Sequence, residues 1–141
     1  MIYVEENDFN RQIELLGLLA ESQPYSICAW LYPESKVSEV AGFKVCSETS
    51  HIEQITTYSD DVTPKYTELV PATKSNIKAY LDAKNELKAN CDSLALYQEK
   101  SLNWFVAAIG HEGMCLVKES GLLSGLLSAG FNATTEAPSW W

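Results

Sequence analysis

The sequence predicts a single α+β domain in which an antiparallel or mixed sheet carries two main helices on one face. Stretches with helical periodicity alternate with stretches rich in β-branched and aromatic residues, in the order helix, strands, helix, strands. A chain of 141 residues has the length of one domain, and neither a repeat nor a linker divides residues 1–141. The nearest named arrangement is the ferredoxin-like βαββαβ pattern, which is an α/β sandwich.

The first part of the chain predicts a strand, a helix and a second strand. Met1–Val4 is a short strand candidate. Asn7 or Asp8 can cap a helix that runs to about Ser22, because apolar residues recur at helical spacing along it. Tyr25–Tyr32 is almost continuously apolar, which is typical of a strand that is buried on both faces.

The middle of the chain predicts three further strands. Ala41–Cys46 is the first of them. Ile52–Tyr58 and Lys65–Val70 flank the acidic loop Ser59–Pro64, and their compositions are those of two strands joined by a turn.

The last part of the chain begins with the second main helix. Thr73 or Ser75 can cap a helix over Asn76–Asn90, which carries an apolar stripe. Gly121–Phe131 predicts a short helix that packs on the sheet or against another subunit, and Asn132–Trp141 has the composition of irregular structure. Between the two helices we expect three strands: Ser93–Tyr97, Asn103–Ile109 and Met114–Lys118.

Charge and cysteine usage narrow the function classes. A formal net charge of −9 without a basic stripe argues against nucleic-acid binding. No apolar run approaches the length of a membrane span, and the acidic opening MIYVEENDF does not resemble a signal peptide. Cys28, Cys46, Cys91 and Cys115 are widely spaced, which favours reduced and mostly buried thiols in a cytoplasmic protein.

Few motifs point to a specific chemistry. No phosphate-binding loop or serine nucleophile elbow is present in the sequence. His111 beside Glu112 is either an acid–base pair or part of a polar turn between two glycines. Trp104 either stacks on a purine or packs in the core or in an interface. Asp60 and Asp61 are too few ligands for a convincing cation site, so we expect no metal.

Glu68 is the carboxylate that the strand pattern singles out. Alternation within Lys65–Val70 puts Glu68 on one face with Tyr66 and Val70. Either this face is open to solvent, or Glu68 is kept on a buried face for function. In a plain hairpin Tyr58 would not share this face, but a bulge, a register offset or another strand order would change that.

Three stretches around Glu68 carry a family resemblance. Gly42-Phe43, followed by Glu48-Thr49, resembles a Gly-aromatic strand that closes on Glu-Ser/Thr. The acid-bearing strand around Glu68 leads into a helix of similar length, and Ser93–Gly110 resembles the hairpin that follows it. In these features, over roughly Ala41–Gly113, the chain resembles the phage-encoded enzymes that degrade S-adenosylmethionine, which are lyases.

The resemblance implies a PII-like α/β sandwich assembled as a homotrimer, with active sites between subunits. It also implies cleavage of S-adenosylmethionine to methylthioadenosine and homoserine lactone, without cofactor or metal, as an anti-restriction activity in the host cytoplasm. Glu68 would bind and orient the substrate and Tyr58 would form a hydrogen-bonding wall, so these two are the catalytic candidates. The further candidates for substrate contact are Tyr66, Glu48, Trp104 and His111.

Two other functions fit the same sequence. One is a small acidic inhibitor or immunity protein, which acts through its charged surface and its terminal tryptophans without enzymatic activity. The other is a PII-like regulator that binds an adenine nucleotide, although basic phosphate-binding residues are missing. Formation of methylthioadenosine from S-adenosylmethionine distinguishes the lyase from both.

Overall fold

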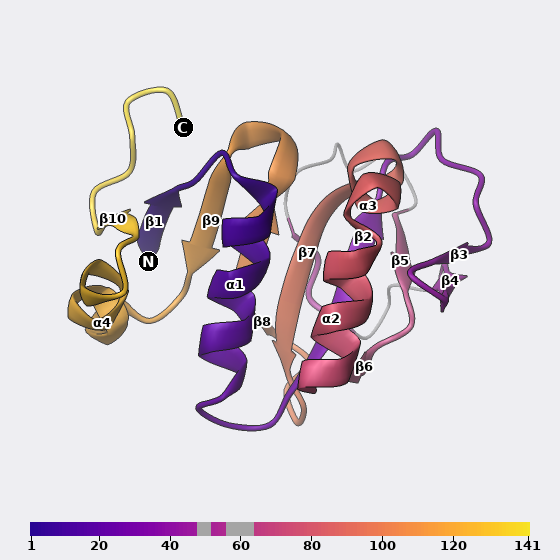
Figure 1. Ribbon diagram of the computed structural model, residues 1–141, viewed down its shortest axis with the longest axis horizontal. Helices are drawn as coiled ribbons and strands as arrows, with labels where there is room; N and C mark the ends of the chain where they lie inside the picture. The colour runs from indigo at the N-terminus through magenta and orange to yellow at the C-terminus, as the bar shows by residue number, and fades with distance from the viewer. Residues whose placement is uncertain (48–51, 56–63) are drawn as a thin grey trace.

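The computed structural model describes residues 1–47, 52–55 and 64–141, in which one antiparallel sheet carries α1, α2 and α3 on the same face (Figure 1). The strand order is β10-β1-β9-β8-β7-β2-β5-β4-β3, and β6 pairs with β2 beside β5. This confirms the α+β class and an antiparallel sheet with its main helices on one face. The strands are β1 (Ile2–Glu5), β2 (Tyr25–Leu31), β3 (Glu39–Val40), β4 (Phe43–Cys46), β5 (Lys65–Thr67), β6 (Val70–Pro71), β7 (Cys91–Gln98), β8 (Trp104–Ile109), β9 (Met114–Val117) and β10 (Asn132–Thr134). The helices are α1 (Phe9–Ala20), α2 (Lys74–Asp82), α3 (Lys84–Asn90) and α4 (Leu123–Ser128), with short 3-10 turns η1 (Gly110–Glu112) and η2 (Ser120–Leu122).

Both main helices begin at the caps that the sequence predicts. The Asp8 side chain accepts a hydrogen bond from the Asn10 N–H, and the Thr73 hydroxyl accepts one from the Asn76 N–H. The predicted helix over residues 76–90 is wrong in one respect, because Ala83 interrupts it at φ −99° and ψ 22°. No glycine or proline marks this break, so the periodicity of the sequence does not show it.

Two helical crossovers organise the sheet. The β1-α1-β2 unit spans the three intervening strands β9, β8 and β7, and the unit from β5 through α2 and α3 to β7 spans β2. Both crossovers lie on the same face, which packs their apolar sides onto one core (Figure 1). Residues 32–42, between β2 and β4, contain no helix, so the first helical crossover that a ferredoxin-like pattern predicts is absent from this segment.

The turn between β3 and β4 corrects the start of a predicted strand. Ala41 and Gly42 have positive φ angles of 55° and 85°, and they form a two-residue turn that pairs Val40 with Phe43. The strand therefore starts at Phe43, two residues later than the alternation of Ala41–Cys46 suggests.

The face opposite the helices has its own core of aromatic and sulfur-containing residues, which include Trp30, Tyr97 and Met114. Ile52 and Ile55 are buried against it. The predicted strand over Ile52–Tyr58 is wrong for residues 52–55, which form no strand. Two isoleucines three positions apart turn to the same face here, which is incompatible with the period-two alternation of a strand. Residues 56–58 and most of the predicted loop 59–64 lie outside the described residues.

The C-terminal part of the chain closes one edge of the sheet. The helix predicted within residues 121–131 is shorter, and α4 buries Leu126 next to β10. The prediction of irregular structure from residue 132 onward is wrong at Asn132–Thr134, because β1 offers an unpaired edge that this segment joins as β10. Trp140 and Trp141 remain 57% and 43% exposed. The centroid of the Trp141 ring system lies 6.3 Å from that of the Tyr3 ring, in an edge-to-face arrangement. No helix within the described ranges is both long and apolar enough to cross a membrane.

All four cysteines are free, and Cys28, Cys91 and Cys115 are buried. The prediction of mostly buried thiols is therefore confirmed. Burial raises the pKa of each of these three thiols above its ordinary value.

Candidate functional site

Glu68 lies at a bulge between β5 and β6. From Tyr66 to Val70 this segment advances four residues, whereas the partner strand β2 advances only three, from Trp30 to Ile27. The extra residue reverses the alternation, so Tyr66 packs in the far-face core and Val70 packs in the helix-face core. The prediction that Tyr66, Glu68 and Val70 share a face is therefore wrong.

The bulge leaves Glu68 exposed at the surface. Its backbone N–H donates to the carbonyl oxygen of Lys44 at 2.7 Å, which fixes the bulge against β4. No hydrogen bond or ion pair joins the Glu68 carboxylate to any residue that the structure describes. The carboxylate is thus held on a fixed backbone and open to a ligand or to another subunit.

Tyr66 is buried beside Glu68, in contact with the aromatic core of the far face. Its ring lies 5.1 Å from that of Trp30, measured between centroids. The Trp30 indole N–H donates to the Tyr97 hydroxyl at 2.9 Å, and this hydroxyl donates to the carbonyl oxygen of Glu53 at 2.8 Å. Burial raises the pKa of Tyr97, so its hydroxyl stays protonated and able to donate.

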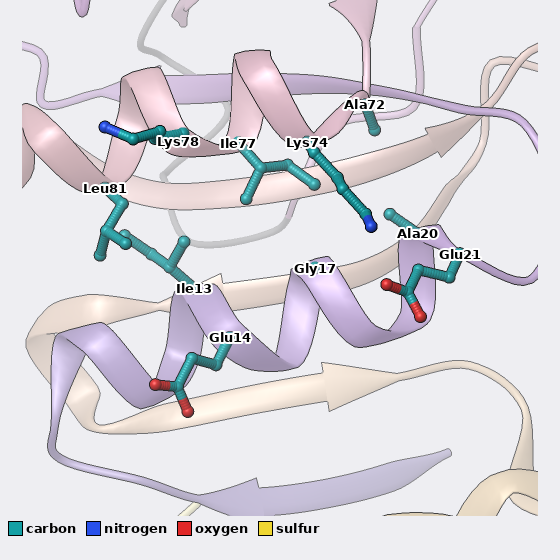
Figure 2. A pocket seen from close by; sticks show the side chains of 10 residues that line it. All are labelled: Ile13, Glu14, Gly17, Ala20, Glu21, Ala72, Lys74, Ile77, Lys78 and Leu81. Carbon is teal, nitrogen blue, oxygen red and sulfur yellow. The ribbon is translucent and has the colours of Figure 1, made fainter.

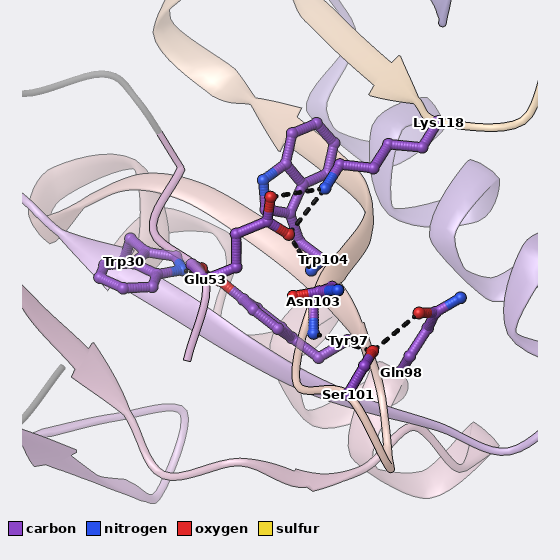
Figure 3. A network of polar contacts seen from close by, with 8 residues as sticks. All are labelled: Trp30, Glu53, Tyr97, Gln98, Ser101, Asn103, Trp104 and Lys118. Carbon is purple, nitrogen blue, oxygen red and sulfur yellow. Dashed lines mark hydrogen bonds and ion pairs between the residues drawn. The ribbon is translucent and has the colours of Figure 1, made fainter. Parts of the chain in front are cut away.

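Trp104 belongs to a polar network at the edge of this core (Figure 3). The Glu53 carboxylate accepts a hydrogen bond from the Trp104 backbone N–H at 3.0 Å and pairs with the Lys118 ammonium at 2.7 Å. The Lys118 Nζ also lies 4.1 Å from the centroid of the Trp104 ring. Because Trp104 is only 8% exposed and a lysine covers its ring, the arrangement fits packing better than purine stacking.

His111 is paired with a buried carboxylate that the sequence analysis did not single out. Its Nδ1 lies 2.7 Å from Oδ1 of Asp92, a residue that is 2% exposed. A bulge explains the placement: Trp30 pairs with Ser93 and Leu31 with Cys91, so Asp92 is the extra residue of β7.

The other ring nitrogen of His111 remains at the surface. Its Nε2 lies 3.4 Å from Oε1 of Glu112, and the His111 side chain is 41% exposed. A cavity of about 240 Å³ adjoins the ring, and its lining includes Tyr32 and Cys91. The imidazole thus stands between two carboxylates beside a cavity, which is an arrangement suited to acid–base chemistry.

The neighbouring cysteine is not an activated nucleophile. Burial, followed by the charges of Glu86 and Asp92, raises the pKa of Cys91 to about 12. Burial and the Asp92 charge also raise the pKa of Tyr32. At neutral pH Cys91 is therefore a thiol, and thiolate chemistry would need a cation that offsets these carboxylates.

The described candidates do not converge within one chain. Trp104 begins β8, whereas His111 follows its opposite end, and Glu68 lies across β2 from both. Glu48 and Tyr58 lie outside the described residues, so their placement relative to Glu68 stays a prediction. Within residues 1–47, 52–55 and 64–141, no three His, Cys, Asp or Glu side chains gather as a metal site.

Sequence reasoning missed Asp92 and Glu53. Asp92 lies two residues before the apolar run Leu94–Tyr97, and a carboxylate so close to a predicted buried strand is the signal that could have marked it. Glu53 lay within a stretch interpreted as a strand, where one polar residue draws no attention.

The chain was also compared with known proteins. No protein-family model, no curated protein and no solved structure matches it.

Proposed function

We propose that the protein cleaves S-adenosylmethionine to methylthioadenosine and homoserine lactone. The observation that carries the proposal is the exposed Glu68 carboxylate, which a bulge fixes beside an aromatic core and which has no partner among the described residues. The strand order β7-β2-β5-β4 with a helical crossover into β7 adds support, because a PII-like core of the ferredoxin-like type has this split β-α-β arrangement. The choice of this particular reaction rests on the resemblance of Ala41–Gly113 to the phage-encoded enzymes that degrade S-adenosylmethionine.

The proposed reaction requires no catalytic group of the protein to take part in bond making or bond breaking. The substrate carboxylate attacks its own γ-carbon, a C–O bond forms, the C–S bond breaks, and the electron pair goes to sulfur. No proton, metal or enzyme nucleophile is needed, so the protein has to fold the methionine arm into a reactive conformation. Because charge is neutralised as carboxylate meets sulfonium, exclusion of water also accelerates the step.

Glu68 has an orienting role in this mechanism. It binds the substrate ammonium or the ribose hydroxyls, and the Tyr58 hydroxyl forms an adjoining wall. Close pairing of Glu68 with the sulfonium would stabilise the ground state more than the transition state, so the carboxylate lies away from sulfur. Trp104 and His111 do not converge with Glu68 within one chain, so they would contact this substrate only from another subunit, and Tyr66 is buried beneath the bulge.

A partner subunit completes the proposed site. In one chain Glu68 is open to solvent, whereas the reaction benefits from a dry site. We therefore propose a homotrimer with sites between subunits, acting in the host cytoplasm, where loss of S-adenosylmethionine removes the methyl donor and a cofactor of some restriction enzymes.

The test is substitution of Glu68 by Gln, which keeps the size of the side chain and removes its charge. We expect Glu68→Gln to abolish most formation of methylthioadenosine while circular dichroism and oligomeric state stay unchanged. Glu39→Gln is the matched control, because Glu39 is also exposed, on β3. Tyr58→Phe should cost less, because one hydroxyl hydrogen bond contributes about 0.5–1.5 kcal/mol.

The assay is run with and without EDTA, and turnover should be equal in both. A folded Glu68→Gln protein with near-wild-type turnover would place the site elsewhere, and the His111–Asp92 pair would be tested next. Wild-type protein without any turnover would refute the proposed reaction itself.

The exposed tryptophans Trp140 and Trp141, next to the half-buried Tyr3, favour a second candidate function. Large exposed aromatic rings are typical anchors of protein–protein interfaces. An acidic inhibitor or immunity protein would use these tryptophans without turning over S-adenosylmethionine. Replacement of both tryptophans by Ser would then abolish partner binding, and neither the wild type nor this variant would form methylthioadenosine.

A further inference from the structure

A groove between α1 and α2 has a volume of about 470 Å³ (Figure 2). Apolar side chains from both helices line it, and Ile13, Ile77 and Leu81 are the largest of them. Charged side chains stand at its rim. Those of α1 and its C-cap are Glu14 and Glu21, and those of α2 are Lys74 and Lys78.

Gly17 lies in the middle of α1 on the wall of this groove. A Cβ built at this position would be 3.9 Å from Cγ2 of Ile77, which is ordinary van der Waals contact, and Gly17 does not have a positive φ. Neither helix packing nor backbone conformation therefore requires a glycine here, although glycine destabilises a helix interior relative to alanine. What the glycine does provide is open space in the groove.

Two charged side chains at one end of the groove, Glu21 and Lys74, form no ion pair within the described part of the chain, whereas the other two rim charges do. Glu14 pairs with Arg11 and Lys78 pairs with Asp82, each at 2.8 Å. In contrast, neither Glu21 nor Lys74 forms an ion pair with another residue in the described ranges. Figure 2 shows both side chains at the Ala20 end of the groove, on opposite walls.

The ends of the two helices reinforce this pair of opposite charges. Glu21 caps the C-terminus of α1, whose last turn contains no basic residue, and Lys74 begins α2, whose first turn contains no acidic residue. Exposed carbonyl groups at the first helix end attract a cation, and exposed N–H groups at the second attract an anion. One end of an apolar groove thus offers one site for a positive group and one for a negative group.

We propose that this groove binds a free α-amino acid with an apolar side chain. The ligand ammonium pairs with Glu21, its carboxylate pairs with Lys74, and its side chain lies along Ile13, Ile77 and Leu81. The volume lies within the range of about 300–1,000 Å³ that is usual for small-molecule sites. A docked protein helix fits less well, since α2 has nine residues and offers a wall only about 13 Å long.

The proposal does not depend on lyase activity, because the groove lies on the helical face and Glu68 lies at the bulge between β5 and β6. Binding is measured by titration of the folded protein with L-leucine, L-methionine and L-phenylalanine, with the methyl NMR signals of Ile13, Ile77 and Leu81 as the readout. We expect saturable shifts of these signals below about 10 mM ligand.

Ligand analogues and rim variants test the two charge contacts separately. Leucine amide lacks the carboxylate and N-acetyl-leucine lacks the ammonium, so each should bind about ten-fold more weakly than leucine. Glu21→Gln should weaken leucine to the same extent and leave N-acetyl-leucine unchanged, whereas Lys74→Met should leave leucine amide unchanged. Glu14→Gln and Lys78→Met are the matched controls on the same rim, and each should change the affinity less than two-fold.

Gly17 variants test the space in the groove. Gly17→Ala should raise the melting temperature by a few degrees and weaken leucine, and Gly17→Leu should abolish binding with circular dichroism unchanged. Equal binding of leucine, its amide and its N-acetyl derivative would reduce the groove to a non-specific apolar surface and overturn the proposal. Absence of shifts for all three amino acids at about 10 mM would also overturn it.

Discussion

His111 should contribute to the stability of the fold through its contact with the buried carboxylate of Asp92, whether or not it takes part in a reaction. Removal of the imidazole takes away one hydrogen-bonding contact of this buried carboxylate, the one in which His111 Nδ1 lies 2.7 Å from Asp92 Oδ1. We expect His111→Gln to lower the free energy of unfolding by about 1–3 kcal/mol, measured by urea denaturation. Glu112→Gln is the control at the same turn, and because Glu112 is exposed its change should stay within about 0.5 kcal/mol. Equal effects of the two substitutions would mean that the Asp92 contact adds nothing to stability.

Cys91 predicts how stability depends on alkaline pH. Burial raises the pKa of this thiol from 9.0 to about 12, so between these values the folded protein retains a proton that the unfolded chain has lost. The resulting stability is fully present below pH 9 and is lost as the pH rises towards 12. At pH 10 the loss attributable to one such thiol is about 1.4 kcal/mol.

The measurement is urea denaturation of wild type and Cys91→Ala at pH 7.5 and at pH 10. Wild type should lose about 1 kcal/mol more than the variant between the two pH values. An equal loss in both proteins would show that Cys91 ionises alike in the folded and unfolded states.

At the scale of elements, the segment over residues 52–55 is attached to the far face of the sheet through Tyr97. The Tyr97 hydroxyl connects Trp30 to the backbone of Glu53. Tyr97→Phe leaves the buried indole N–H without an acceptor, so we expect a loss of about 1–3 kcal/mol in the free energy of unfolding. The control is Tyr3→Phe, because the Tyr3 hydroxyl makes no hydrogen bond with another described residue, and its effect should stay within about 0.5 kcal/mol. A loss in Tyr97→Phe no larger than in this control would refute the proposed attachment.

The elements that the sequence predicted correctly are those with strong local signals. Asp8 and Thr73 cap helices through their own side chains. The apolar residues of β2 and β7 would be costly to expose to water, so their composition alone predicts buried strands. The bulges at Glu68 and Asp92 were not predicted, because each depends on how two distant strands come into register.

The candidate site was less predictable than the fold, for the same physical reason. The bulge reverses which face of the sheet successive side chains point to, so Tyr66 and Val70 lie on opposite faces and Glu68 is exposed. The pair of His111 and Asp92 joins the η1 turn to β7, and no pattern in either stretch indicates the other.

At the scale of the whole molecule, oligomer formation is the most direct prediction. The uncovered Glu68 and the exposed tryptophans Trp140 and Trp141 are surfaces that another subunit can cover. We expect light scattering to give the mass of a trimer, three times 15.7 kDa, at micromolar concentration. A monomer under these conditions would contradict both the trimer and the proposed site between subunits.

The position of β1 in the sheet has a consequence for how the chain is made. Its neighbours in the described sheet are β9 and β10, and Val4 lies opposite Cys115 and Ala133. When synthesis has reached residue 100, β1 therefore still lacks both of its hydrogen-bonding neighbours. Until β9 emerges, the apolar side chains of Ile2 and Val4 have no completed core to enter, and they are open to chaperones and to other nascent chains. Although β1 precedes β9 and β10 by more than a hundred residues, it pairs only when they have been made.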